Sequence, residues 1–190
     1  MKEKDELRRL FLPRRRVLED DFIGRAGISI SVHLGKIREI EECVNIAAFY
    51  PSDGEPDITG FLKEQIKKGK GVCFPRARRP EKCYEMAFIT DLGKDFERGD
   101  FRIMEPREGI PSVPADVLNN ILWLVPGVAF DFNGGRLGHG KGIFDRLLKG
   151  TSGIKIGICY DWQIVDAVPA GENDIKMDFI VTESGSRVCS

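Results

Sequence analysis

Apolar positions along this 190-residue chain first follow a helical spacing and then collect into short continuous runs. Residues 2–20 are rich in Lys, Arg and Glu, and their apolar positions are spaced for one face of a helix. Pro13 is expected to break or offset that helix, because proline lacks the backbone N–H. A second helical pattern runs from residue 20 to about residue 43. Together the two patterns predict a helical N-terminal segment over residues 1–43.

After residue 43, apolar runs alternate with helical and turn-rich segments. Each run is short and has few polar positions, as in strands that are covered on both faces. The expected strands are Val44–Tyr50, Gly71–Phe74, Tyr84–Ile89, Ile121–Val125, Ile154–Tyr160 and Phe179–Thr182. Helices are expected from about Asp57 to Lys67 and near residues 141–149, whereas residues 90–114 are expected to be irregular.

Strands that alternate with helices predict an α/β fold, here a three-layer, largely parallel twisted sheet flanked by helices, with N-terminal helices. The length fits a single domain over residues 1–190. In such sheets ligands bind beyond the carboxyl ends of the strands. The loops that follow Tyr50, Phe74, Phe130 and Tyr160 are therefore the places to look for a site.

Composition excludes several classes of function. With 29 Lys and Arg against 30 Asp and Glu, the net charge of −1 does not favour binding to nucleic acid or to an anionic membrane. There is no apolar run of about 20 residues for a membrane span, and the charged N-terminus lacks the apolar stretch of a signal peptide. The five cysteines have no C-x-x-C spacing, which favours reduced thiols in a cytoplasmic protein. We expect a monomer.

The segment Asp131–Asp145 carries the strongest chemical signal. It has glycines at positions 134, 135, 138, 140 and 142, and it lies between a strand and a helix. Glycines let successive backbone N–H groups turn toward one anion, and Arg136, His139 and Lys141 supply side chains for phosphoryl oxygens. The spacing fits neither the P-loop nor the dinucleotide fingerprint. A flexible surface turn with charges placed by chance is the alternative.

The same segment resembles a known family. Val125–Asp131 followed by Gly135–Arg146 resembles the pattern V-P-G-x-A-F-D-x-x-G-x-R-L-G-x-G-x-G-Y-Y-D of the 5-formyltetrahydrofolate cyclo-ligases, also called methenyltetrahydrofolate synthetases. Further segments resemble family features in the same order: Lys4–Arg8, Tyr50–Asp57, Gly69–Arg76, Met104–Pro106 and Val168–Glu183. The resemblance covers nearly the whole chain and is weakest between residues 9 and 43.

This resemblance implies an ATP- and Mg²⁺-dependent enzyme. It would convert 5-formyltetrahydrofolate to 5,10-methenyltetrahydrofolate and release ADP and phosphate, by phosphorylation of the formyl oxygen followed by ring closure. The implied partners are a reduced folate and ATP, with no nucleic acid and no membrane.

The resemblance also implies roles for individual residues. The implied ATP-binding residues are Lys4, Arg8, Gly135, Arg136, Leu137, Gly138, His139, Gly140, Lys141, Gly142 and Phe144, of which Arg136 and Lys141 are the candidate catalytic residues. The implied folate-binding residues are Tyr50, Glu55, His139 and Ile143, to which we add Arg76 as a phosphate or glutamate-tail contact. Asp145 and Asp174 are the implied magnesium ligands.

The chain departs from the family pattern immediately before Asp145, where Ile143 and Phe144 replace Tyr-Tyr. Two hydroxyl groups and one aromatic ring are lost, and one missing stacking or hydrogen-bond contact is worth on the order of 1 kcal/mol. Two other functions stay open for this reason. One is a non-catalytic relative that binds nucleotide or folate, and the other is a variant ligase that acts on another formyl or carboxyl substrate.

Overall fold

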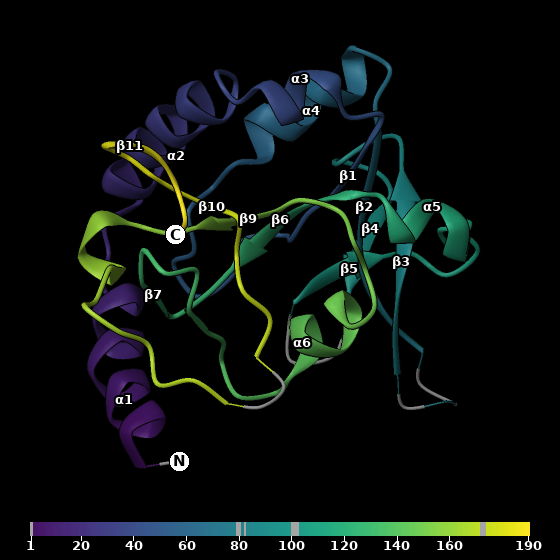
Figure 1. Ribbon diagram of the computed structural model, residues 1–190. Coiled ribbons are helices and arrows are strands. Elements are labelled where there is room, and N and C mark those ends of the chain that lie inside the picture. The colour runs from purple at the N-terminus through teal and green to yellow at the C-terminus, as the bar shows by residue number, and fades with distance from the viewer. Residues whose placement is uncertain (1, 79–80, 82, 100–102, 172–173) are drawn as a thin grey trace.

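The computed structural model describes residues 2–78, 81, 83–99, 103–171 and 174–190 (Figure 1). The helices of the described residues are α1 (Lys2–Arg16), α2 (Asp20–Leu34), α3 (Arg38–Glu42), α4 (Thr59–Lys67), α5 (Ala115–Asn119) and α6 (Ile143–Leu148), and η2 (Asp161–Gln163) is a 3-10 turn. The strands are β1 (Asn45–Ala47), β2 (Gly71–Arg78), β3 (Cys83–Ile89), β4 (Phe96–Arg98), β5 (Met104–Pro106), β6 (Leu122–Pro126), β7 (Ala129–Phe130), β8 (Arg136–Leu137), β9 (Lys155–Ile158), β10 (Phe179–Thr182) and β11 (Gly185–Val188).

The described strands include a seven-stranded sheet in the order β11-β10-β9-β6-β1-β2-β3. Its five inner strands, from β10 to β2, are parallel, and the edge strands β11 and β3 are antiparallel to their neighbours. From β1 the chain moves outward to β2 and later returns to β6 on the other side of β1. The loops that leave β1 and β6 therefore diverge, which opens a crevice at the carboxyl ends of these two strands.

Side chains alternate between the two faces of this sheet and make a core on each. On one face, Ile46 of β1 and Leu122 of β6 pack with residues of α2, α3 and α4. On the other, their neighbours Ala47 and Trp123 pack with residues of α6. Figure 1 shows the same arrangement, with α2, α3 and α4 on one side of the sheet and α5 and α6 on the other. The expected three-layer α/β fold with a largely parallel sheet is confirmed.

Several local predictions were wrong. Helix α1 continues through Pro13, because the buried side chains of Phe11 and Arg15 hold the helix on both sides of the exposed proline. The second helical pattern divides into α2 and α3 near Gly35. Residues 90–114 are not wholly irregular, since β4 and β5 pair as an antiparallel ladder.

All five cysteines are free thiols, and no helix of the described residues is long and apolar enough to cross a membrane.

The buried ring of Phe130 packs closely against Gly157, and this contact leads to a prediction about stability. A Cβ atom at Gly157, in β9, would lie 2.6 Å from Cε1 of this ring, and Phe130 is fully buried. Gly157→Ala is therefore expected to lower the free energy of unfolding by about 1–3 kcal/mol, the usual cost of an overpacked core. Denaturant unfolding measures the change.

Gly60 offers a matched control because it lies inside α4 with nothing within 4 Å of the added Cβ. Gly60→Ala is expected to leave the protein as stable or to stabilise it by up to about 1 kcal/mol, because alanine is the better helix former. Equal unfolding midpoints for Gly157→Ala and the wild-type protein would contradict the tight packing around Phe130.

Candidate active site

A cleft of about 600 Å³ lies where the loops that follow β1 and β6 diverge. Its walls are formed by residues 49–55 after β1, by Pro126 at the end of β6, by the glycine loop 138–145, and by β5. Both apolar and charged groups face it. The crevice that the topology predicts is therefore a real cavity, large enough for a small-molecule ligand.

Most of the candidate residues named from the sequence meet in this cleft. Those that line it are Tyr50, Glu55, Arg136, Gly138, His139, Lys141, Gly142, Ile143, Phe144 and Asp145. Gly135 and Leu137 do not line it: the Gly135 N–H donates to Asp131 Oδ1 at 2.9 Å, and Leu137 is buried in the cluster that contains Phe11. Gly140 lies against the Arg8 guanidinium.

The glycine loop is shaped by Asp131 and by left-handed glycines. The Asp131 carboxylate accepts the N–H groups of Asn133 and Gly135 through Oδ1, and that of Val168 through Oδ2. These bonds close the turn between β7 and β8. Gly140 and Gly142 have φ angles of 98° and 63°, which L-residues with a Cβ rarely adopt. Glycine at these two positions allows the loop to turn back along the cleft before α6 begins.

Helix α1 lies beside the glycine loop. The Arg8 Nε–H donates to the carbonyl of Gly138 at 3.0 Å, and the Lys4 ammonium binds the Asp174 carboxylate. The Gly171 N–H donates to the same carboxylate at 2.7 Å. Lys4, Arg8 and Asp174 are thus held at the edge of the glycine loop, although none of the three lines the cleft.

Arg136 has its side chain in the wall of the cleft. The guanidinium is almost fully buried, donates from Nη1 to the carbonyl of Pro126 at 3.1 Å, and pairs with Asp145 through Nη2. Burial lowers the pKa of Arg136, while the nearby carboxylates of Asp145 and Asp174 oppose this change. Asp145 and Asp174, the two predicted magnesium ligands, therefore both interact electrostatically with the buried Arg136 guanidinium.

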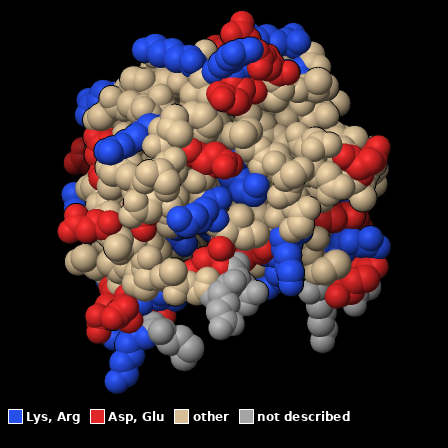
Figure 2. Space-filling view, in the orientation of Figure 1, with Lys and Arg blue, Asp and Glu red and all other residues tan. Residues whose placement is uncertain are grey.

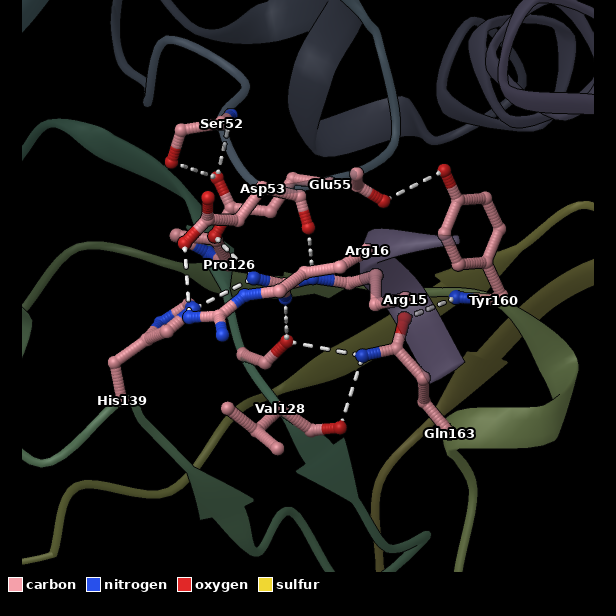
Figure 3. A network of polar contacts seen from close by, with 12 residues as sticks. Arg15, Arg16, Ser52, Asp53, Glu55, Pro126, Val128, His139, Tyr160 and Gln163 are labelled. Carbon is pink, nitrogen blue, oxygen red and sulfur yellow. Dashed lines mark hydrogen bonds and ion pairs between the residues drawn. The ribbon is translucent and has the colours of Figure 1, made fainter. Parts of the chain in front are cut away.

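Glu55, in the loop after β1, is a buried carboxylate with only 5% of its surface exposed. The backbone N–H and the hydroxyl of Ser52 donate to Oε2 at 3.0 and 3.2 Å, and Oε1 lies 3.6 Å from Nη2 of Arg15 (Figure 3). Burial raises the pKa of Glu55, and the positive charge of Arg15 acts in the opposite direction. The loop after β1 thus presents a carboxylate whose orientation is fixed.

Sequence reasoning missed Arg15, which is only 1% exposed and contacts both walls. The signal was present in the spacing: Lys4, Arg8, Phe11 and Arg15 recur at intervals of four, three and four and share one face of α1. The second missed residue is Glu105 of β5. It lines the cleft, is 7% exposed, and accepts the N–H of Ala77 at 3.2 Å.

His139 contacts the Arg15 guanidinium through Nε2 at 2.6 Å, in a part-buried contact. Removal of the imidazole from water, together with the charge of Arg15, lowers the pKa of His139 from 6.5 to about 4. The unfolded chain therefore binds a proton between about pH 6.5 and pH 4 that the folded chain does not bind. As pH falls through this window, the free energy of unfolding falls.

His139→Gln is expected to flatten this part of the pH–stability curve. The effect is smaller than the full pKa difference implies, because His139 as a whole residue is exposed to solvent. Urea unfolding of the wild-type protein and of the variant, at a series of pH values from 7 to 4, measures the two slopes. An equal flattening in His33→Gln would assign the slope to histidine content rather than to the cleft.

The sequence of the chain matches a known protein family. The model of the 5-formyltetrahydrofolate cyclo-ligase family matches residues 1–183. The chain belongs to this family.

Individual proteins that are similar to this chain carry the name of the same family. The chain is 28% identical to the 5-formyltetrahydrofolate cyclo-ligase of Escherichia coli K12 over 179 residues, covering 90% of this chain and 95% of the relative. It is 27% identical to the probable 5-formyltetrahydrofolate cyclo-ligase of Schizosaccharomyces pombe, covering 95% of each. Among solved structures, the 5,10-methenyltetrahydrofolate synthetase of Aquifex aeolicus superposes with a TM-score of 0.83 at 34% identity, covering 97% of this chain and 92% of that one.

In this chain, Ile143 and Phe144 begin α6, and both line the cleft. Both are half-buried and pack on the core cluster that contains Trp123 and Leu147. The family's Tyr-Tyr pair is thus replaced by apolar side chains that contribute shape and no hydroxyl group to the cleft wall.

Arg76 does not join the other candidate residues. Its guanidinium binds Glu85 of β3 and donates from Nη1 to the carbonyls of Arg107 and Ile110 at 2.8 and 2.9 Å. These contacts tie β2 and β3 to the segment after β5. Arg76 lines a separate hollow of about 230 Å³, and the structure does not bring it to the cleft.

On the face shown in Figure 2, positive and negative side chains are intermixed with wide uncharged areas, and no large patch of one sign is visible. The positive groups that could attract phosphate are instead those of the glycine loop and of α1 described above.

Proposed function

We propose that the protein catalyses the ATP- and Mg²⁺-dependent conversion of 5-formyltetrahydrofolate to 5,10-methenyltetrahydrofolate, with release of ADP and phosphate. The observation that carries this proposal is the pairing of two unlike walls in one cleft. The loop after β1 contributes the buried Glu55 carboxylate, and the glycine loop contributes Lys141 and Arg136 to the lining of the same cleft. A pterin and a triphosphate need these two kinds of surface at a short distance from each other.

The reaction has a leaving-group problem that these residues can address. The formyl oxygen attacks the γ-phosphorus, ADP leaves, and the carbon is now joined to a phosphate ester oxygen. N10 then attacks this carbon and loses its proton, and the C–O bond breaks as phosphate departs. Phosphoryl transfer of this kind depends mainly on positioning and on neutralising charge. A protein nucleophile is not required.

On the folate side, Glu55 is proposed to accept N–H groups of the pterin through Oε1, since Oε2 already accepts two bonds from Ser52. Tyr50 and Ile143, which both line the cleft, are proposed to pack against the flat pterin ring. A buried carboxylate selects for a ligand with matching donors, because any other ligand leaves it unpaired. Glu55 is therefore the proposed determinant of folate binding.

On the nucleotide side, Lys141 in the glycine loop is proposed to bind the transferred phosphoryl group. Lys4 and Arg8 of α1 lie at the edge of the same loop and are proposed to contact the other phosphates. Arg136 contributes positive charge from within the wall and holds Asp145 in place. The backbone of residues 138–142 completes the surface against which the triphosphate lies.

The donor set also fits magnesium. Among the described residues, no group of three or more His, Cys, Asp and Glu could hold a metal ion by itself. Mg²⁺ is commonly bound by one or two carboxylates together with substrate phosphates and waters. The Asp145 and Asp174 side chains are 35% and 33% exposed and carry hard oxygen donors beside the phosphate-binding cations. Bound there, the ion would neutralise phosphate charge and orient the triphosphate.

One assay tests the proposal. Purified protein is mixed with ATP, Mg²⁺ and 5-formyltetrahydrofolate, and the near-ultraviolet absorbance of the methenyl product is followed together with ADP release. We expect both signals to rise together and to require Mg²⁺.

Two other results would overturn the proposal. ADP release without the methenyl chromophore would favour a variant ligase with another formyl or carboxyl substrate. If folded protein binds reduced folate and forms no product, the chain is a binding relative, for which the loss of both tyrosine hydroxyls before Asp145 would be the structural reason.

A further inference from the structure

One guanidinium occupies the point at which three separate loops of the cleft converge. Arg15, one residue before the end of α1, donates from Nε to the carbonyl of Asp53 at 2.8 Å and from Nη1 to the carbonyl of Gly127 at 3.1 Å. Its Nη2 lies 2.6 Å from Nε2 of His139. Figure 3 shows the guanidinium with partners on several sides. Three segments that are remote in sequence are thus joined through a single side chain.

The chain around Arg15 is tightly packed. A Cβ atom at Gly54 would lie 2.2 Å from the backbone carbonyl oxygen of Arg15, so the loop after β1 passes directly against the end of α1. The carbonyl of Gly127 also accepts from Gln163 at 3.0 Å, and the Tyr160 hydroxyl donates to the carbonyl of Gly54 at 3.1 Å. The Gly127 carbonyl that accepts from Arg15 is therefore itself held in place, and so is Gly54, the residue that follows the Asp53 acceptor.

The contact with His139 has a consequence for the proton on its ring. A guanidinium has only N–H donors, so the imidazole nitrogen that faces it must be the acceptor. A neutral imidazole with an unprotonated Nε2 carries its proton on Nδ1. His139 lines the cleft. Its Nδ1–H is then a neutral donor in the glycine loop, beside the proposed phosphate site.

We propose that Arg15 is a positioning residue that joins the folate wall at Glu55 to the phosphate wall at His139 and fixes His139 in the Nδ1–H tautomer. This inference rests on the proposed function for its kinetic consequence, but the tautomer does not depend on any substrate. Arg15 itself is enclosed and acts through the groups that it holds. Because its five N–H donors lie in a rigid plane, a lysine cannot hold the same set of acceptors.

Nitrogen NMR of the histidine rings tests the tautomer directly in the wild-type protein. The chain has two histidines, so His33→Gln leaves the His139 signals alone and assigns them. We expect the Nε2 signal of His139 at the position of an unprotonated nitrogen and the Nδ1 signal at that of a protonated one. An Nε2–H tautomer, or rapid exchange between the two forms, would overturn the inference whether or not the protein turns over folate.

A second measurement uses Arg15→Met, which keeps length and packing and removes every donor, and Arg15→Lys, which keeps the charge. The matched control is Arg9→Met, because Arg9 is exposed on the same helix. If the coupled assay of methenyl product and ADP shows turnover, Arg15→Met is expected to lower kcat/KM for the reduced folate by about 100-fold, the effect of a small misplacement of reacting groups. The Nδ1–H tautomer of His139 is expected to be lost at the same time.

Arg15→Lys should recover only part of the activity. A folded Arg15→Met protein that keeps the wild-type kcat/KM would overturn the positioning role while leaving the proposed function in place. If the wild-type protein has no turnover, the proposed function fails and the tautomer measurement still decides the structural inference. Where the wild-type protein turns over folate, the double substitution Arg15→Met with His139→Gln should lower kcat/KM no further than the more damaging of the two single substitutions. The reason is that the two residues act as one unit.

Discussion

Lys141→Ala is expected to reduce ATP-dependent turnover by about 10²–10³-fold, the usual loss when one preorganised group that stabilises transition-state charge is removed. Lys141 is exposed and lines the cleft in the glycine loop, and exposed substitutions usually change stability by no more than about 0.5 kcal/mol. The coupled assay of methenyl product and ADP measures the loss. The unfolding midpoint is expected to stay at the wild-type value.

The control for this variant is Lys149→Ala. Lys149 is exposed and follows the last residue of α6, and it does not line the cleft. Both substitutions remove one positive charge, so a general electrostatic effect on ATP would appear in both. Full turnover by Lys141→Ala, or an equal loss in Lys149→Ala, would remove Lys141 from the proposed phosphate site.

Glu55→Gln is expected to raise the KM for 5-formyltetrahydrofolate by about 10–100-fold, because hydrogen bonds to a charged group contribute about 1.5–3 kcal/mol. The KM for ATP should change much less, since Glu55 belongs to the loop after β1 and not to the glycine loop that is proposed to bind the phosphates. Steady-state kinetics with each substrate varied in turn separates the two constants.

The same substitution also affects stability. It leaves the guanidinium of Arg15, which is 1% exposed, without its carboxylate partner. Removing one member of a buried pair commonly costs about 3–5 kcal/mol, so the free energy of unfolding should fall. Glu64→Gln, on the exposed side of α4, is the matched change of carboxylate to amide. If Glu55→Gln has an unaltered KM for folate, the pterin does not bind at this carboxylate.

The parts of the fold that sequence can predict are those set by local apolar pattern. The runs around β1, β6, β9 and β10 are largely buried, and each expected strand lies close to its observed place. Strand β11 is missed because Ser186, Arg187 and Val188 are exposed and show no buried pattern. The break expected in α1 is wrong because the local effect of Pro13 can be seen in the sequence, whereas the tertiary contacts of Arg15 cannot.

In the candidate site, too, the local sequence pattern predicts some features, and others depend on tertiary contacts. Glycine spacing and charge in the loop 134–145 predict a phosphate-binding surface, with a surface turn as the alternative, and the structure places most of this loop at the cleft. What the spacing cannot show is which side chains face each other. Arg136 turns into the wall against Asp145, and Arg76 is bound to Glu85 away from the cleft. Both orientations follow from strand pairing and burial, which a local pattern does not contain.

The joining of α1 to distant loops also sets an order of events during synthesis and folding. Lys4 and Asp174 are 170 residues apart, and Arg15 meets His139 across 124 residues. Contacts of such separation form slowly, because long segments must be ordered first. At about 5–20 residues per second, α1 leaves the ribosome on the order of ten seconds before His139 is made. During that interval Arg15 can meet Asp53 and Glu55 but not His139, so the loop after β1 can join α1 well before the glycine loop does.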